Sequence, residues 1–194
     1  MLTQKRLSKI KSVASGRQEG IVVLQDIYDP HNAAAVLRTA DAFGIQKVFF
    51  IFGKREKFNP KKVGKAASSS ANKWLTFKVF SSTKDCFRQL KRQGYSIVGT
   101  VLDEQAKSIF KTKLTYPKIA LVFGNEHSGL SAEAVAMSDI RVYIPMRGFV
   151  QSLNLSVTAA ICMYEVFRQR QKQLHKFLLG KWEQNKLAKL WQKN

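Results

Sequence analysis

Short apolar runs recur along this chain, and segments with a helical pattern separate them. The clearest runs cover residues 21–24, 48–52 and 119–123, and each is apolar at every position. A strand that is apolar on both faces fits a parallel sheet whose two sides are covered by helices. The sequence therefore predicts an α/β fold with helices on both faces of a parallel sheet.

The other elements follow from turn and capping signals. Further strands are expected at residues 77–80, 95–101 and 140–144, and helices at 30–44, 83–93, 131–138, 153–171 and 176–191. Pro30 suits a first helical turn, Gly94 ends a helix and Ser131 can cap one. In folds of this class ligands bind beyond the carboxyl ends of the strands, so we look for a site among the residues that follow those ends.

The charge balance points to a polyanionic partner. Lys and Arg total 33 against 13 Asp and Glu, which gives a net charge of +20. Nucleic acid is the expected partner, and an anionic membrane surface is the alternative. The first 20 residues lack the apolar core of a signal peptide, and no stretch is long and apolar enough to span a bilayer. We expect a cytoplasmic protein that does not enter a membrane.

Cysteine usage favours a reducing compartment. Cys86 and Cys162 lie far apart in apolar surroundings, so we expect two free, buried thiols. No Cys/His cluster has the spacing of metal ligands, so no metal is expected. The 194 residues indicate one domain at 20–165, a basic helical segment at 1–19 and a basic amphipathic helical extension at 166–194.

Both terminal segments are basic. Apolar residues recur at roughly helical spacing in the C-terminal extension, so one face can pack on the domain while the other faces a polyanion. Arg17 and Arg170 belong to these segments as well. The candidate RNA-binding residues of the two segments are Lys5, Arg6, Lys9, Lys11, Arg168, Lys172 and Lys176.

Two residues of the first helix after a strand are candidates for chemistry. Asn32 lies in the first turn, where its simplest role is that of a helix cap or turn residue. Arg38 stands in an alanine-rich stretch of the same helix. It is either a solvated helix charge or a group that meets a phosphate at close approach.

Two later segments also follow strand ends. Glu126 comes after residues 119–123, where it could cap a helix, neutralise an arginine or serve as a base. We expect its neighbour His127 to be a structural or rim residue. Ser152 and Asn154 open the long helix at 153–171, and either can be its N-cap.

Read together, these segments resemble a known family. N-x₅-R-T-A begins at Asn32, F-G-N-E-x-x-G-L begins at Phe123, and I-P-M at Ile144 precedes S-L-N-x-S at Ser152. In this order they resemble the three motifs of the SPOUT superfamily, SpoU/TrmH branch, over about residues 20–165. Members are S-adenosylmethionine-dependent RNA 2'-O-ribose methyltransferases. The absence of a G-x-G-x-x-G after a strand argues separately against the usual dinucleotide fold.

The resemblance implies a deep trefoil knot at about residues 119–165, which the pattern of apolar residues alone would never predict. It also implies a homodimer with each active site near the subunit interface. The cofactor is S-adenosylmethionine, and no metal takes part. The cofactor-binding residues implied by the resemblance are Thr100, Gly124, Ile144, Ser152 and Leu153.

The resemblance also assigns catalytic roles. Arg38 is expected to bind the target phosphate and to take the proton from the ribose 2'-hydroxyl, although arginine is so basic that this step needs an unusual environment or help from the phosphate. Glu126 is expected to orient Arg38 or the cofactor. The catalytic set implied by the family is Arg38, Asn32, Glu126, Ser152 and Asn154.

The implied substrate is RNA. The short basic segments at both ends resemble family members that methylate guanosine 18 in the D-loop of tRNA. Ribosomal RNA is the alternative. It is less favoured because relatives that act on it often carry a separate N-terminal RNA-binding domain, for which residues 1–19 leave no room. A non-catalytic RNA-binding protein on the same scaffold is a minor alternative, disfavoured because Arg38, Glu126 and Asn154 are all present.

Overall fold

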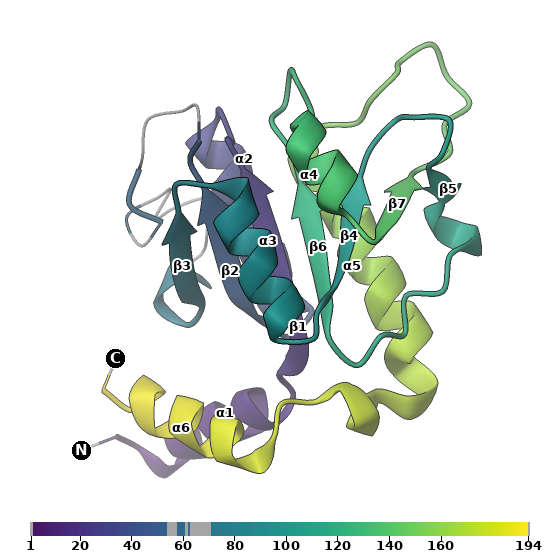
Figure 1. Ribbon diagram of the computed structural model, residues 1–194. Coiled ribbons are helices and arrows are strands. Elements are labelled where there is room, and N and C mark those ends of the chain that lie inside the picture. Colours follow the sequence, from purple (N-terminus) through teal and green to yellow (C-terminus); the bar gives the residue numbers. More distant parts are fainter. Residues whose placement is uncertain (1, 54–57, 61, 63–70, 194) are drawn as a thin grey trace.

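The computed structural model describes residues 2–53, 58–60, 62 and 71–193. They form a seven-stranded sheet in the order β3-β2-β1-β6-β4-β7-β5, in which all neighbouring strands run parallel (Figure 1). This confirms the predicted α/β class. The basic stretch between β2 and residue 72 lies largely outside the described residues.

Every predicted strand is present, with small shifts at its ends. β1 begins at Gln18, three residues before the predicted start, and its register with β2 shifts between Gln18 and Ile21. β5 was not predicted, since two residues are too short to show a pattern. The strands are β1 Gln18–Gln25, β2 Ile45–Ile51, β3 Thr76–Phe80, β4 Ser96–Thr100, β5 Lys107–Ser108, β6 Ile119–Phe123 and β7 Ile140–Tyr143.

The helices also follow the prediction, except at the C-terminus. They are α1 Gln4–Ser15, α2 Pro30–Ala42, α3 Thr83–Arg92, α4 Ala132–Met137, α5 Leu155–Arg170 and α6 Lys181–Trp191, with 3₁₀ turns at Ala71–Lys73, Ile109–Lys111 and Gln171–Phe177. The last helix was predicted to begin at residue 176, but it begins at Lys181. Leu178 forms an antiparallel bridge with Gln18, and the Leu179 amide donates to the Arg17 carbonyl at 2.8 Å, so the chain is extended there.

Alternate residues of the strands build two cores. Val22 and Leu24 of β1 pack with residues of α2 and α5 on one face of the sheet. Ile21 and Val23 pack with residues of α3 and α4 on the other face. Figure 1 shows α3 and α4 in front of the sheet and α2 and α5 behind it. The strands are apolar on both faces because both faces are covered.

A third, smaller core joins the two ends of the chain. Ile10 and Ala14 of α1 pack against Leu187 and Trp191 of α6, at the end of the sheet where the strands begin (Figure 1). The two terminal segments are therefore one two-helix unit.

Two arginines of the basic terminal segments are buried rather than available to a polyanion. Arg17 is 1 % exposed and donates to both the carboxylate and the carbonyl of Asp41. Arg170 is also 1 % exposed and donates to the carbonyls of Glu19 and Tyr116, both at 2.8 Å. Burial lowers the pKa of Arg170 to about 10, and Glu19 partly opposes that effect. Arg17 thus connects the N-terminal segment to the end of α2, and Arg170 connects the end of α5 to β1 and to Tyr116.

Cys86 and Cys162 are both free and buried, as predicted. Burial raises the pKa of each thiol to about 12. Such thiols are poor nucleophiles at neutral pH. Within the part of the chain that the structure describes, no helix is long and apolar enough to cross a bilayer.

Candidate active site

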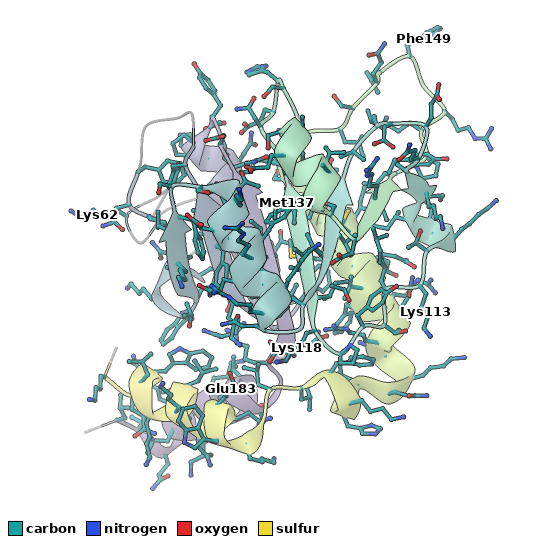
Figure 2. The ribbon with its side chains drawn as sticks, viewed as in Figure 1. Lys62, Lys113, Lys118, Met137, Phe149 and Glu183 are labelled. Carbon is teal, nitrogen blue, oxygen red and sulfur yellow. The ribbon has the colours of Figure 1, made fainter. Side chains whose placement is uncertain are left out.

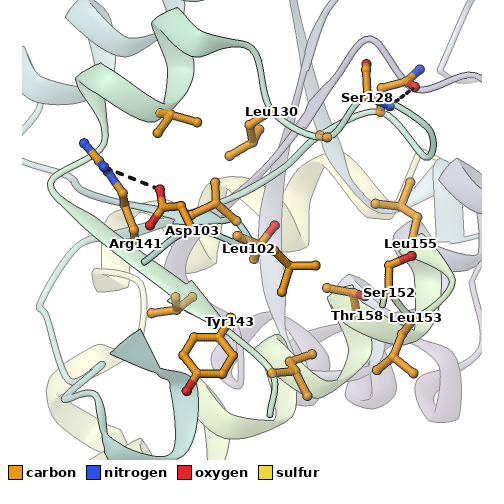
Figure 3. Close-up of a pocket in the computed structure, with 18 of the residues that line it drawn as sticks. Leu102, Asp103, Ser128, Leu130, Arg141, Tyr143, Ser152, Leu153, Leu155 and Thr158 are labelled. Atoms are coloured by element: carbon orange, nitrogen blue, oxygen red, sulfur yellow. Dashed lines mark hydrogen bonds and ion pairs between the residues drawn. The ribbon is translucent and has the colours of Figure 1, made fainter. Parts of the chain in front are cut away.

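A cavity of about 720 Å³ opens beyond the carboxyl ends of β4, β6 and β7 (Figure 3). Its volume lies within the roughly 300–1,000 Å³ of small-molecule sites. The five residues predicted to bind the cofactor all line it: Thr100, Gly124, Ile144, Ser152 and Leu153. Residues of the second and third motifs therefore line one cavity, whereas Asn32, Arg38 and Asn154 are not among its lining residues.

The walls of the cavity differ in polarity. Leu102, Leu130 and Leu155 supply apolar side chains, which suit a flat heterocycle (Figure 3). At one end Arg141 forms an ion pair with Asp103 at 3.4 Å. The hydroxyl of Thr100 donates to the Val122 carbonyl at 3.0 Å, which leaves its oxygen free to accept from a ligand.

The turn after β6 forms one side of the cavity. Its amides and carbonyls at Asn125 and Gly129 pair with each other at 2.9 and 3.0 Å. A Cβ atom on Gly124 would overlap the backbone of Gly129, so only glycine allows this approach. The buried Asn125 side chain completes the turn by donating to the Asp26 carbonyl at 2.7 Å and accepting from the His127 amide at 2.9 Å.

Glu126 connects this turn to the start of α2. Its carboxylate accepts from the Tyr28 amide at 2.8 Å, the Asp29 amide at 3.1 Å and the Asn32 side chain at 3.0 Å. Partial burial raises the pKa of Glu126, but the hydrogen bonds from Asn32 and from backbone amides outweigh it and hold the pKa below its ordinary value. Glu126 is therefore an anion at neutral pH.

Asn32 is not the N-cap of α2. Asp29 has that role, because its side chain accepts from the His31 amide at 2.8 Å and Pro30 follows it directly. The Asn32 side chain is thereby free to connect two other segments. Its nitrogen donates to Glu126, and its oxygen accepts from the Asn154 side chain at 3.1 Å.

Asn154, rather than Ser152, caps α5. Its oxygen accepts from the amide of Ser156 at 2.8 Å and from the hydroxyl at 2.6 Å. Ser152 precedes the cap, is exposed and lines the cavity. A continuous series of hydrogen bonds thus runs from Glu126 through Asn32 and Asn154 to Ser156.

Arg38 lies apart from this series. It is exposed on α2, about 9 Å beyond Asn32 along the helix given the rise per residue. Within the described part of the chain, no hydrogen bond or ion pair joins it to Glu126 or Asn154. Its guanidinium faces solvent, where a substrate could meet it.

The sequence interpretation missed several contributors to the site. Asp29, Asn125 and Ser156 hold the motif residues in place, although each stands inside or beside a motif. A signal for Asp29 was present, since an Asp directly before a Pro at the first helical position is a typical start of a helix. His127 is exposed at the rim of the cavity.

The seven basic residues of the terminal segments that were predicted to bind RNA are all exposed. Those of the N-terminal segment lie on α1, and Lys172 and Lys176 lie on the 3₁₀ turn after α5. Arg168 also forms an ion pair with the buried Glu165 at 2.7 Å. Across the described ranges, no three His, Cys, Asp or Glu side chains gather as metal ligands would.

Comparison with known proteins gives consistent matches. The model of the SpoU rRNA Methylase family matches residues 19–164. A tRNA (guanosine(18)-2'-O)-methyltransferase of Thermus thermophilus is 37% identical over 173 residues, which are 88% of this chain and 86% of that protein. These matches extend over most of both chains.

Solved structures agree. The A. aeolicus TrmH/SpoU tRNA modifying enzyme superposes with a TM-score of 0.85 at 32% identity, covering 97% of this chain and 95% of that one. The SpoU methyltransferase AviRb of Streptomyces viridochromogenes, solved in complex with the cofactor AdoMet, has a TM-score of 0.70 at 28% identity. That match covers 80% of this chain and 62% of AviRb.

Proposed function

The chain belongs to the SpoU rRNA Methylase family, and we propose that it methylates the ribose 2'-hydroxyl of guanosine 18 in tRNA, with S-adenosylmethionine as the methyl donor. It is an RNA 2'-O-methyltransferase. One observation carries this proposal from the structure itself. Glu126 and Asn154 lie 94 and 122 residues after Asn32 in the sequence, yet the three side chains form one hydrogen-bonded series beside a cavity.

The cavity fits the cofactor. Its apolar walls suit the adenine ring, and backbone groups at Gly124, Ile144 and Leu153 are available to hold the polar edge of that ring. Thr100 offers a hydroxyl oxygen and Ser152 a hydroxyl group. When bound, S-adenosylmethionine supplies the activated methyl group. The bound cofactor of the AviRb structure supports this assignment.

The side chains of the protein position the substrate and form no covalent bond with it. We assign Glu126 to positioning, because its oxygens are engaged by Tyr28, Asp29 and Asn32 and its pKa is low for a base. The amides of Asn32 and Asn154 are fixed by that series, so they can hold the ribose without reorganising. Ser152 stands at the cavity and can contact the same sugar.

Arg38 is proposed to contact the substrate directly. Its exposed guanidinium can bind a phosphate with two parallel hydrogen bonds. A phosphate held there fixes the attached ribose next to the hydrogen-bonded asparagines. The phosphate can also assist removal of the 2'-proton, a task for which arginine alone is too basic.

The terminal two-helix unit is proposed to hold the rest of the tRNA. Its exposed basic side chains suit the phosphate backbone. The A. aeolicus structure covers 97% of this chain, terminal segments included, which favours tRNA over ribosomal RNA. With tRNA as the substrate, a cytoplasmic location is expected.

We propose a homodimer formed through the outer face of α5. Val157 and Tyr164 lie two turns apart on this helix and are 46% and 53% exposed, although both are apolar or aromatic. The loop before α5 adds two exposed apolar side chains, Val150 and Phe149, and Phe149 projects from the top of the molecule (Figure 2). A second copy would cover this apolar surface. Val157→Glu should therefore give a monomer in sedimentation.

The knot at about residues 119–165 is also a proposal. Family membership supports it. So does the contact of α5 with the segment before β6, where the Gln169 side chain accepts from the Leu114 amide at 2.8 Å and donates to the Thr112 carbonyl at 2.9 Å. That segment therefore lies against the helix that follows β7.

The decisive experiment is methylation of defined RNA. The protein is incubated with labelled S-adenosylmethionine and unmodified tRNA transcripts, and the label is mapped by nuclease digestion and mass spectrometry. We expect 2'-O-methylguanosine at position 18. A tRNA with 2'-deoxyguanosine at that position is the matched control and should stay unlabelled, since the acceptor hydroxyl is missing.

Two other outcomes would change the proposal. Methylation of ribosomal RNA fragments with no label in tRNA would keep the enzyme and replace its substrate. Absence of methylation in both, with no thermal shift on addition of S-adenosylmethionine, would favour the non-catalytic RNA-binding alternative.

A further inference from the structure

Two aromatic side chains stand together beside the cavity, where His127 lines it and Tyr28 packs against His127. The rings of Tyr28 and His127 have centroids 5.6 Å apart and meet edge to face at 71°. Tyr28 is 58% exposed, and His127 is exposed and lines the cavity. They flank Glu126 in space, since Tyr28 donates to its carboxylate and His127 follows it in the chain.

The backbone under both rings is fixed. The Tyr28 amide donates to Glu126 at 2.8 Å, and the His127 amide donates to the buried Asn125 side chain at 2.9 Å. Asn125 in turn holds the carbonyl of Asp26 at 2.7 Å, so the two loops are connected to each other. The backbone that carries the two rings is therefore in place before any substrate arrives, which lowers the entropic cost of binding to them.

The position of the pair suits a nucleobase. A ribose held by Asn32 and Asn154 would bring its base next to the carboxylate that links Asn32 to Tyr28. Proteins read bases of RNA loops chiefly by stacking them on Tyr, Phe, Trp or His. A half-exposed tyrosine beside the cavity offers such a surface.

We propose that Tyr28, supported by His127, is the stacking platform for the base attached to the reacting ribose. This inference rests on the proposed function and adds a base-binding group to it. It explains how an enzyme whose other site residues contact phosphate, sugar and cofactor can select an unstacked nucleotide. The platform binds the substrate and takes no part in proton transfer.

Kinetics of single variants test the proposal. Tyr28→Ala should raise the KM for tRNA by about five- to 150-fold, the range for loss of one base–aromatic stack. Tyr28→Phe keeps the ring and should stay within about twofold of the unmodified protein. Phe110→Ala removes another exposed aromatic ring, 54% exposed and outside the cavity lining, and should have no effect. Binding of S-adenosylmethionine should be unchanged in all three.

A fluorescence measurement reads the stack directly and does not need turnover. A D-arm hairpin carries 2-aminopurine in place of the target guanine, and its emission should fall on binding to the protein. Tyr28→Ala should abolish that fall, and His127→Ala should weaken it. If Tyr28→Ala fails to fold, His127→Ala and Tyr28→Leu are compared in its place.

Three results would overturn the platform. The first is unchanged KM and unchanged quenching in Tyr28→Ala. The second is an equal loss of cofactor binding, which would make the ring a cover for the cofactor. The third is conversion to a monomer, which would make it a subunit contact. If the unsubstituted protein quenches 2-aminopurine but methylates no RNA, the proposed function is contradicted, whereas the stacking role of Tyr28 is supported.

Discussion

The side-chain nitrogen of Asn154 donates to the side-chain oxygen of Asn32 at 3.1 Å, across 122 residues of sequence. Asn154 is the N-cap of α5, and Asn32 lies in the first turn of α2. One hydrogen bond thus connects the starts of the two helices that cover the same face of the sheet. A residue that serves as a cap is at the same time a member of the proposed catalytic set.

The two roles of Asn154 can be separated by substitution. Asn154→Ala removes both the cap and the bond to Asn32, and we expect it to lower the free energy of unfolding by about 1 kcal/mol. Asn154→Asp keeps an oxygen that accepts from Ser156 but cannot donate to Asn32, so its stability should be near that of the unmodified protein. Both variants should lose methylation. Full activity of Asn154→Asp in a stopped assay would show that the donor is dispensable.

Glu126→Gln should reduce turnover by about 100-fold while the fold persists. Glutamine can accept at one oxygen only, so the Tyr28 amide, the Asp29 amide and the Asn32 side chain can no longer all be satisfied. Steady-state kinetics with tRNA measure the turnover, and circular dichroism checks that the fold persists. A turnover within a few-fold of the unmodified protein would rule out the positioning role.

The same variant reveals a pH dependence. Because the pKa of Glu126 is lower in the folded protein than the ordinary 4.5, its contribution to stability is fully present above pH 4.5 and is lost as pH falls through the folded value. The difference in unfolding free energy between the unmodified protein and Glu126→Gln should therefore be constant above pH 4.5 and shrink below it. Denaturant titrations at several pH values measure that difference. A gap that widens toward acid pH would contradict the sign.

Local patterns predicted most of the fold. The Ser131 cap of α4 is where the sequence places it, with the Ala134 amide donating at 3.2 Å. The apolar runs gave the strands because a strand buried on both faces leaves a local signature. The local pattern did not always show which of two candidate residues caps a helix. Asp29 and Asn32, like Ser152 and Asn154, are pairs of good caps a few residues apart. Pro30 directly after Asp29 is a local signal for Asp29, whereas no such signal separates Ser152 from Asn154.

The connections between motifs could not be predicted from local sequence. The bond from Asn32 to Glu126 depends on β1 and β6 being neighbours, which follows from the order of strands in the sheet. Burial of Arg170 likewise depends on where α5 ends against the sheet. A basic residue in a basic tail looks solvated in the sequence. Only the packing distinguishes Arg170 from its exposed neighbour Lys172.

Arg38→Ala should lower turnover by about 100- to 1,000-fold, the loss typical of removing one group that stabilises developing charge. Arg38 is exposed and makes no hydrogen bond within the described part of the chain, so stability and cofactor binding should not change. Arg88→Ala, an exposed arginine of α3 on the opposite face of the sheet, is the matched control. Comparable activity of the two variants would remove Arg38 from the site.

Gly124→Ala tests whether the turn after β6 builds the cavity. The added Cβ would overlap the backbone of Gly129, so the turn must open, and overpacking of this kind costs about 1–3 kcal/mol. Because Gly124 lines the cavity, binding of S-adenosylmethionine should fall with stability. Gly148→Ala is the control, since a Cβ there meets nothing within 4 Å. Calorimetry of cofactor binding and thermal unfolding should separate the two variants clearly. If both glycine variants bind the cofactor equally well, the close approach of Gly124 to Gly129 is not needed to form the pocket.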